Sequence, residues 1–145
     1  MALLKKQSTD KFIELMVEST PFLKLISFVQ LNEPVCSCPL VTLARYKTLY
    51  GGLMVALDKK TGEEIWRLEM PHYAWSSPVD FYNENGKGYI IQCDSIGNIH
   101  LIDGATGNIL DTINLGANIE SSPAIFEDTI VIATRGGKIF GIKIE

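Results

Sequence analysis

Residues 57–62 read LDKKTG, and residues 102–107 read IDGATG, 45 positions further along the chain. A second motif has the same period, because the SSP of residues 76–78 returns at residues 121–123. Two unrelated motifs that share one spacing indicate an internal structural repeat. We interpret Ser37-Cys38-Pro39 as a third, degenerate copy of the second motif, at a shorter spacing of 39 residues. The fold prediction rests on this repeat.

Each repeat alternates short apolar runs with turn residues. Between Pro78 and Ile113, four apolar runs are separated by turns rich in Asn, Asp, Ser and Gly. Four short strands in a unit of this length are typical of a β-propeller blade. The sequence therefore predicts an all-β fold of four-stranded antiparallel blades.

The repeat also suggests how the chain is divided. We expect a short N-terminal helix within residues 1–21 and propeller repeats over residues 22–145. The blade units lie near residues 36–70, 75–115 and 120–145, and residues 23–31 form a lone strand, the fourth of a blade whose other strands are absent. These are about three blade equivalents, whereas closed propellers have four to eight. We therefore expect an incomplete ring, either a segment of a larger propeller or a protomer that associates.

The repeated turn has a local physical reason. The Asp carboxylate can accept backbone N–H groups two and three positions on, the Thr hydroxyl can do the same, and Gly adopts positive φ freely. We therefore interpret Asp58 and Asp103 as turn formers rather than as acid catalysts. The structural motif residues are Ala56, Asp58, Thr61, Gly62, Trp66, Asp103, Thr106 and Gly107.

Residues 56–66, ALDKKTGEEIW, resemble the tryptophan-docking motif of pyrroloquinoline-quinone (PQQ) repeats, Ala-x-Asp-x-x-x-Gly-x-x-x-Trp. Such repeats build the propellers of quinoprotein dehydrogenases and of cofactor-free relatives such as the outer-membrane assembly lipoprotein of Gram-negative bacteria. The chain is more similar to the cofactor-free members. The resemblance implies that Trp66 docks between neighbouring blades. In the second copy Leu101 replaces Ala and Asp111 replaces Trp, which implies a weaker contact there.

Composition narrows the function classes. With 13 basic and 17 acidic side chains, the chain has a net charge of −4, which argues against nucleic-acid binding. The most apolar stretch, residues 12–29, contains three charged residues and a proline, so we expect no membrane span. Residues 1–6 are not followed by the apolar core of a secretory signal, which favours the cytoplasm, although members of the resembling family are often exported.

Catalytic chemistry is not expected. Alcohol-oxidising quinoproteins share a vicinal cysteine pair, a bound ion and a catalytic aspartate, whereas Ser37 separates Cys36 from Cys38 here. No run of carboxylates resembles a calcium loop, and no His-x-x-x-His pair occurs. We therefore expect no catalytic, cofactor-binding or metal-ligating residues and no cofactor, PQQ included. A fragment of a quinoprotein oxidoreductase is the enzymatic alternative.

One repeated position carries different side chains, which is how repeat proteins encode specificity. Trp75, Glu120 and Cys36 each stand just before a Ser-x-Pro motif. We interpret Tyr73, Trp75 and Asp94 as a contact patch, with inter-blade packing of Trp75 as the alternative. The favoured function is a non-catalytic scaffold or binding module, with a protein partner or self-association that completes the propeller. Carbohydrate or polymer binding at the same patch is a further alternative.

Overall fold

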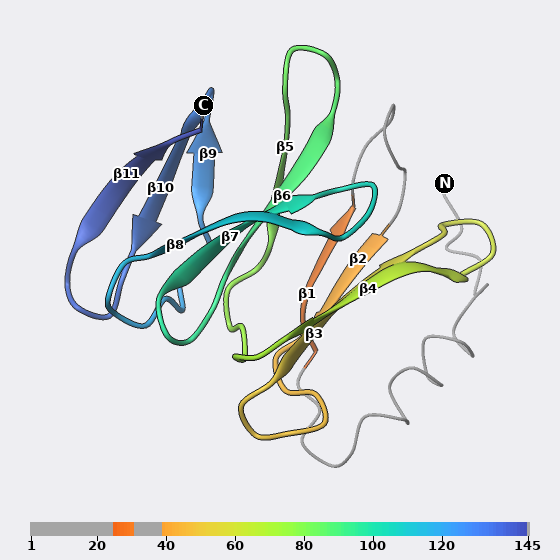
Figure 1. Ribbon diagram of the computed structural model, residues 1–145, viewed down its shortest axis with the longest axis horizontal. Coiled ribbons are helices and arrows are strands. Elements are labelled where there is room, and N and C mark those ends of the chain that lie inside the picture. The colour runs from red at the N-terminus through yellow and green to blue at the C-terminus, as the bar shows by residue number, and fades with distance from the viewer. Residues whose placement is uncertain (1–24, 31–38, 145) are drawn as a thin grey trace, which may run out of the picture.

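The structure is a computed structural model that describes residues 25–30 and 39–144. Its strands form three antiparallel sheets that lie side by side in chain order (Figure 1). The first sheet contains β1 (Leu25–Gln30), β2 (Pro39–Leu43), β3 (Gly52–Leu57) and β4 (Glu64–Met70). The second contains β5 (Val79–Tyr82), β6 (Gly88–Cys93), β7 (Asn98–Asp103) and β8 (Ile109–Asn114). The third contains β9 (Ala124–Phe126), β10 (Thr129–Ala133) and β11 (Ile139–Lys143).

The prediction of an all-β fold built from propeller blades is confirmed. Each sheet runs as a simple meander, in which every strand pairs with the strand that follows it in the sequence. The described residues contain no helix, and so none that is long and apolar enough to cross a membrane. The helix expected within residues 1–21 lies outside the described residues.

The assignment of residues 23–31 to a lone strand was wrong. β1 does form there, but it pairs antiparallel with β2, with Phe28 opposite Val41 and Val29 opposite Leu40. It is therefore the first strand of the first sheet, and this blade begins at Leu25 rather than near residue 36. The apolar content of this segment indicated the strand correctly, but it did not indicate that the strand pairs with β2.

The interpretation of Ser37-Cys38-Pro39 as a third copy of the Ser-x-Pro motif was also wrong. In the second sheet this motif precedes the first strand, β5, whereas Pro39 begins the second strand, β2, and lies opposite Gln30. The true counterpart of Val79 is Val29, since each pairs with the second strand of its sheet at equivalent places. The loop over residues 44–51 is longer than its counterpart at residues 94–97, and this difference disguised the register.

The two genuine Ser-Ser-Pro motifs hold the inner strands in place. The hydroxyl of Ser76 donates to the carbonyl oxygen of Cys93 at 3.0 Å, and Ser121 donates to that of Ala133 at 2.8 Å. The second serine of the later motif reaches the neighbouring sheet, where Ser122 Oγ accepts the backbone N–H of Ser77 at 2.9 Å. The repetition of these serines is therefore explained by strand ends and by sheet-to-sheet contact.

The core lies between the sheets, because successive strand residues point to opposite faces. Ile90 and Ile102 of the second sheet pack toward the first sheet, whereas Ile91 and Ile99 pack toward the third. The first junction also contains Leu40, Met54, Ala56, Trp66, Met70 and Ala74. The second junction also contains Cys93, Ile119, Ile130 and Ile132.

Candidate functional site

Trp66 fills the junction between the first and second sheets. It lies on β4 opposite Ala56 and is 8% exposed. Its indole Nε1 donates to the carbonyl oxygen of Gly104 at 3.1 Å. Gly107 leaves room for the ring, since its φ is +74° and a Cβ there would lie 2.5 Å from the Trp66 Cε3. The glycine-containing turn of the second sheet is therefore the surface on which the tryptophan of the first sheet rests.

The aspartates of the repeated turns act as local acceptors. Oδ1 of Asp103 accepts the backbone N–H groups of Ala105 and Thr106 at 3.0 and 3.1 Å. Asp58 accepts from the residues two and three positions on, both at 2.8 Å. The hydrogen bond from Lys87 and these backbone N–H groups hold the pKa of Asp103 below its ordinary value. Both carboxylates are thus engaged in shaping turns.

Asp111 takes the place of Trp66 at the junction between the second and third sheets. It lies opposite Leu101 on β7, as Trp66 lies opposite Ala56 on β3. The shorter carboxylate does not fill the space of an indole, and an open groove of about 280 Å³ lies there. The remaining lining residues are mostly aliphatic: Ile91, Ile99, Leu101, Thr112, Ile113, Ile130, Ile142, Lys143 and Ile144.

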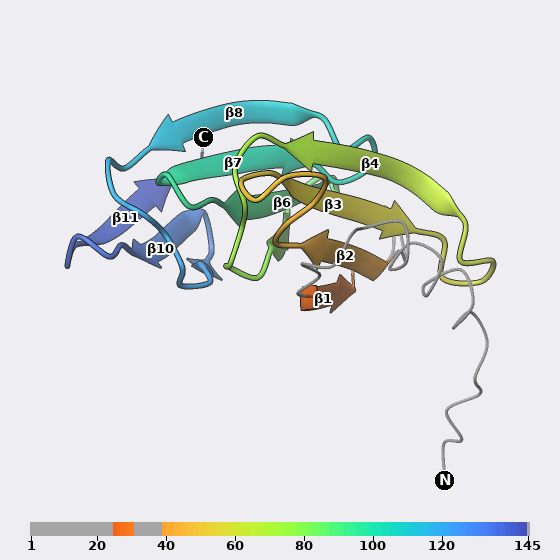
Figure 2. The ribbon, with the colours of Figure 1, turned by 90° about the horizontal axis from the view of Figure 1, so that it is seen from below.

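The outer strands of the first and second sheets, β4 and β8, differ in how far their side chains are buried. β4 and β8 lie along the same edge of the molecule, as Figure 2 shows, and occupy equivalent places in their sheets. On β4, Trp66 and Met70 are buried and Leu68 is half-buried. Every residue of β8 is exposed, including Leu110 and Ile113. The first junction is therefore closed by the outer strand, and the second is open.

The far side of the third sheet is an apolar surface, which we call the outer sheet face and which is composed of Ala124, Phe126, Val131, Ala133 and Ile139. Phe126 and Ile139 are 75% and 77% exposed, and Val131 is 44% exposed. Their neighbours Ile130 and Ile132 point to the opposite side and are buried against the second sheet. The incomplete ring expected from the repeat implies an uncovered blade face, but the apolar run over residues 130–132 does not by itself show which of its faces is open.

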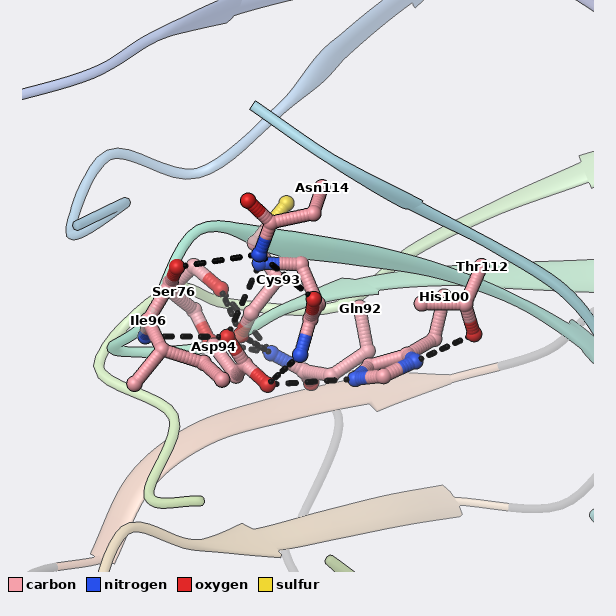
Figure 3. Close-up of polar contacts among 9 residues, drawn as sticks. Ser76, Gln92, Cys93, Asp94, Ile96, His100, Thr112 and Asn114 are labelled. Atoms are coloured by element: carbon pink, nitrogen blue, oxygen red, sulfur yellow. Dashed lines mark hydrogen bonds and ion pairs between the residues drawn. The ribbon is translucent and has the colours of Figure 1, made fainter. Parts of the chain in front are cut away.

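A buried polar network connects the turn between β6 and β7 to β8 (Figure 3). Asp94 is fully buried, and its carboxylate accepts the backbone N–H groups of Ile96 and Asn98 at 3.0 and 2.9 Å. His100 Nε2 lies 3.3 Å from Asp94 Oδ2, and His100 Nδ1 lies 2.9 Å from the hydroxyl of Thr112. The network therefore holds a tight turn and the start of β7 in one arrangement.

The electrostatics of this network do not create a nucleophile. Burial raises the pKa of Asp94, but the hydrogen bonds from His100, Asn98 and Ile96 outweigh it and hold the pKa below its ordinary value. Burial, followed by the neighbouring Asp94 carboxylate, raises the pKa of the Cys93 thiol to about 12. Cys93 is thus a protonated, buried thiol, whereas reactive cysteines have lowered pKa values.

The expected contact patch is only partly assembled. Tyr73 and Trp75 lie edge to face with ring centroids 6.1 Å apart, and the Arg45 guanidinium lies 5.8 Å from the Tyr73 ring centroid. Both rings are half-buried. Asp94 cannot contribute to a surface patch, because its side chain is buried and its oxygens accept internal hydrogen bonds. That part of the prediction was wrong.

A quinoprotein would need an ion site beside its cofactor. Among residues 39–144, no group of three or more His, Cys, Asp or Glu side chains is placed to hold a metal ion. Cys36 and Cys38 lie outside the described residues. The ion site that such a cofactor uses is therefore not formed among the described residues.

Similar proteins were found by sequence and by structure. No family model matches the chain. Over 89 residues it is 30% identical to the outer membrane protein assembly factor BamB of Kangiella koreensis, a match that covers 61% of this chain and 22% of that protein. The BamB of Shewanella oneidensis is 30% identical over 86 residues, 58% of this chain and 20% of that protein. The chain thus matches about a fifth of the length of these relatives.

A solved structure supports the same fold. The crystal structure of BamB from Moraxella catarrhalis superimposes with a TM-score of 0.56 at 16% identity. The superposition covers 83% of this chain and 35% of that one. The expected similarity to PQQ-repeat propellers, and within them to the assembly-factor type, is confirmed.

Proposed function

We propose that this chain, which is similar to the BamB-type propellers, is a non-catalytic scaffold module that works by docking its outer sheet face against another blade. The sequence similarity to an outer membrane protein assembly factor supports the scaffold part of this proposal. The observation that carries the docking part is the exposure of Phe126 and Ile139 on an otherwise ordered blade.

The residues of the outer sheet face occupy the same positions in the third sheet as the residues of the second sheet that contact the third. Ala133 pairs with Ile139 at the end of the β10–β11 hairpin, as Cys93 pairs with Ile99 in the β6–β7 hairpin. Ile99 is 4% exposed because the third sheet covers it, whereas Ile139 is 77% exposed. The surface is therefore shaped and patterned to receive a blade rather than a small ligand.

Burial of the outer sheet face by another blade would lower the free energy. Exposed apolar surface contributes about 25 cal/mol per Å² when it is removed from water, and exposed strand edges promote association. A further blade would cover the side chains of Phe126, Val131 and Ile139 together. The blade comes from a second copy of this chain or from the remainder of a larger propeller, and the solution mass separates these two cases.

The test is molar mass by size-exclusion chromatography with light scattering. We expect the wild-type chain to form a defined dimer, or to associate progressively if the natural occupant is a different blade. Ile139→Glu places a charge on the outer sheet face and should restore the monomer. Ile96→Glu is the matched control, since Ile96 is 46% exposed on a turn away from this face. A wild-type monomer at high concentration, unchanged by Ile139→Glu, contradicts the proposal.

The patch formed by Tyr73 and Trp75 remains a second proposed contact. Its support is the edge-to-face ring pair beside Arg45, an arrangement of aromatic and guanidinium groups that is frequent at protein interfaces. Trp75→Ala, tested in the same light-scattering series and against immobilised polysaccharides, separates a protein contact from a carbohydrate contact. If Trp75→Ala associates and binds polysaccharides as the wild-type chain does, the ring serves only in packing.

The proposal includes the absence of PQQ chemistry. A titration of the chain with PQQ and calcium, followed by the quinone absorbance, should leave the free-quinone spectrum unchanged. A saturable spectral shift would instead support the quinoprotein alternative.

A further inference from the structure

The first junction shows how this fold seats an aromatic ring. Trp66 lies between two sheets with its indole N–H on the Gly104 carbonyl oxygen, 3.1 Å away. Gly104 is itself fixed by its backbone N–H, which donates to the carbonyl oxygen of Gly88 at 3.0 Å. The seat thus consists of an aliphatic wall, the turn that contains Gly107, and one carbonyl oxygen that is held in place by the adjacent hairpin.

The second junction contains the aliphatic wall and the carbonyl position of this seat, without a ring and without a described counterpart of the Gly107 turn. The backbone N–H of Ile144 donates to the carbonyl oxygen of Asp128 at 2.7 Å, the same link that joins Gly104 to Gly88. Ile144 is therefore the counterpart of Gly104, and it lines the open groove together with Asp111, the counterpart of Trp66. The acceptor position and the aliphatic walls are present, whereas the side chain that would occupy them is short and charged.

The size of the groove is suited to an aromatic side chain. A cavity of about 150 Å³ lined by aliphatic residues already binds benzene in a well-studied protein. The groove here has a volume of about 280 Å³, and an adjoining cavity shares the lining residues Leu101 and Ile144 with it. An inserted ring would bury the exposed side chain of Ile113, which now lies at the groove wall without cover.

The charges around the groove indicate the sequence that carries the ring. Asp111 and Lys143 both line the groove, and three carboxylates line the adjoining cavity: Glu84, Glu127 and Asp128. Lys143 lies 3.4 Å from Asp128 and offsets one of these carboxylates. The surroundings are therefore acidic on balance, which favours a partner with positive charges next to its aromatic residue.

We propose that the groove between the second and third sheets binds an aromatic side chain, tryptophan above all, from a partner polypeptide segment in which basic residues flank the ring. The indole N–H donates to the Ile144 carbonyl oxygen, and the flanking lysines or arginines face Asp111, Glu84 and Glu127. This site is separate from the outer sheet face, because neither Phe126 nor Ile139 lines the groove or the adjoining cavity.

Peptide binding measured by fluorescence anisotropy tests this site. The probes are fluorescein-labelled pentapeptides of sequence Gly-Lys-Trp-Lys-Gly, with Gly-Lys-Ala-Lys-Gly and Gly-Glu-Trp-Glu-Gly as controls. The tryptophan peptide with lysines should bind at least about tenfold more tightly than either control, a difference of roughly 1.4 kcal/mol. Equal binding of the alanine peptide would overturn the proposal, because the ring would then contribute nothing.

Variants of β8 locate the binding. Asp111→Trp supplies the missing ring from the chain itself and should reduce peptide affinity at least about tenfold. Ile109→Trp is the matched control on the same strand, because Ile109 lines neither cavity, and it should bind as the wild type does. Unchanged binding by Asp111→Trp would overturn the assignment. If that variant does not fold, Asp111→Lys decides, since reversal of this charge must weaken binding of the lysine-containing peptide.

The same experiment separates this site from the proposed docking of blades. Ile139→Glu should bind the peptide as tightly as the wild type while it loses self-association. Loss of peptide binding in Ile139→Glu would show that the peptide occupies the outer sheet face, and would overturn the groove assignment while leaving the docking proposal intact.

Discussion

The two junctions between sheets differ in the side chain at one register position and in the sheet that receives it, since the described residues form four strands in the second sheet and three in the third. At the first junction, Trp66 crosses from β4 to the next sheet and is 8% exposed. At the second, Asp111 occupies the same register position on β8 and leaves a groove of about 280 Å³. The aliphatic layers on either side are similar, with isoleucines buried at both junctions. Two successive sheets can therefore keep similar aliphatic layers while one junction is closed by an aromatic ring and the next is left open.

This comparison explains which part of the repeat carries stability. Large apolar rings contribute most where they are fully enclosed, whereas an exposed carboxylate contributes little. The first junction should therefore contribute more to the free energy of unfolding than the second.

Trp66→Ala should cause the largest loss of stability. The variant removes a buried ring and its hydrogen bond to Gly104, and we expect a loss of about 3–5 kcal/mol in the free energy of unfolding. Urea denaturation followed by circular dichroism measures it. Ile65→Ala on the same strand is the control, because Ile65 is exposed. Equal losses in the two variants would show that the tryptophan does not hold the junction.

Gly107→Ala should destabilise the first junction more than a comparable glycine elsewhere. Both Gly107 and Gly137 have positive φ, +74° and +73°, so alanine is strained at either position. Only at Gly107 would the new Cβ also meet the Trp66 ring. We expect a loss of about 2 kcal/mol or more at Gly107 and about 1 kcal/mol at Gly137, from the same denaturation curves. Equal losses of stability in the two variants would show that the contact with the Trp66 ring does not contribute.

Asp94→Asn should change the pH dependence of stability. The folded-state pKa of Asp94 is lowered, so its carboxylate stabilises the fold above about pH 4, and this contribution is lost as the pH falls through the folded-state pKa. We expect Asp94→Asn to be less stable than the wild type by about 1–2 kcal/mol at pH 7. The difference should narrow below pH 4. A difference that is constant from pH 7 to pH 3 would contradict the role of the ionised form.

Asp111→Ala should have the smallest effect. The side chain is exposed, and the hydrogen bond that it accepts from the backbone N–H of Thr112 is local. We expect a change within about 0.5 kcal/mol in the free energy of unfolding. A loss similar to that of Trp66→Ala would mean that the second junction is locked in a different way, and the comparison would fail.

Much of the architecture could be predicted from the sequence, because the repeat of Asp, Thr and Gly fixes turns through local hydrogen bonds. Asp103 and its backbone partners are an example, since the carboxylate reaches only two and three positions along the chain. Local chemistry of this kind leaves its signature in the spacing of residues.

The errors came from features that depend on distant partners. β1 was recognised as a strand, but its pairing with β2 depends on the connection between them. Asp94 was placed in a surface patch because a polar turn residue is normally exposed, whereas here His100 and Asn98 enclose it. The incomplete ring implied an uncovered blade face, but the residues of that face could not be identified, since an apolar strand has the same sequence whether one or both of its faces are covered.

Docking of another blade on the outer sheet face can be measured by sedimentation velocity of the wild-type chain and of Ile139→Glu over a tenfold range of concentration. We expect the wild-type chain to sediment faster as its concentration rises and Ile139→Glu to remain a monomer throughout. Monomeric sedimentation of both proteins at every concentration would contradict it.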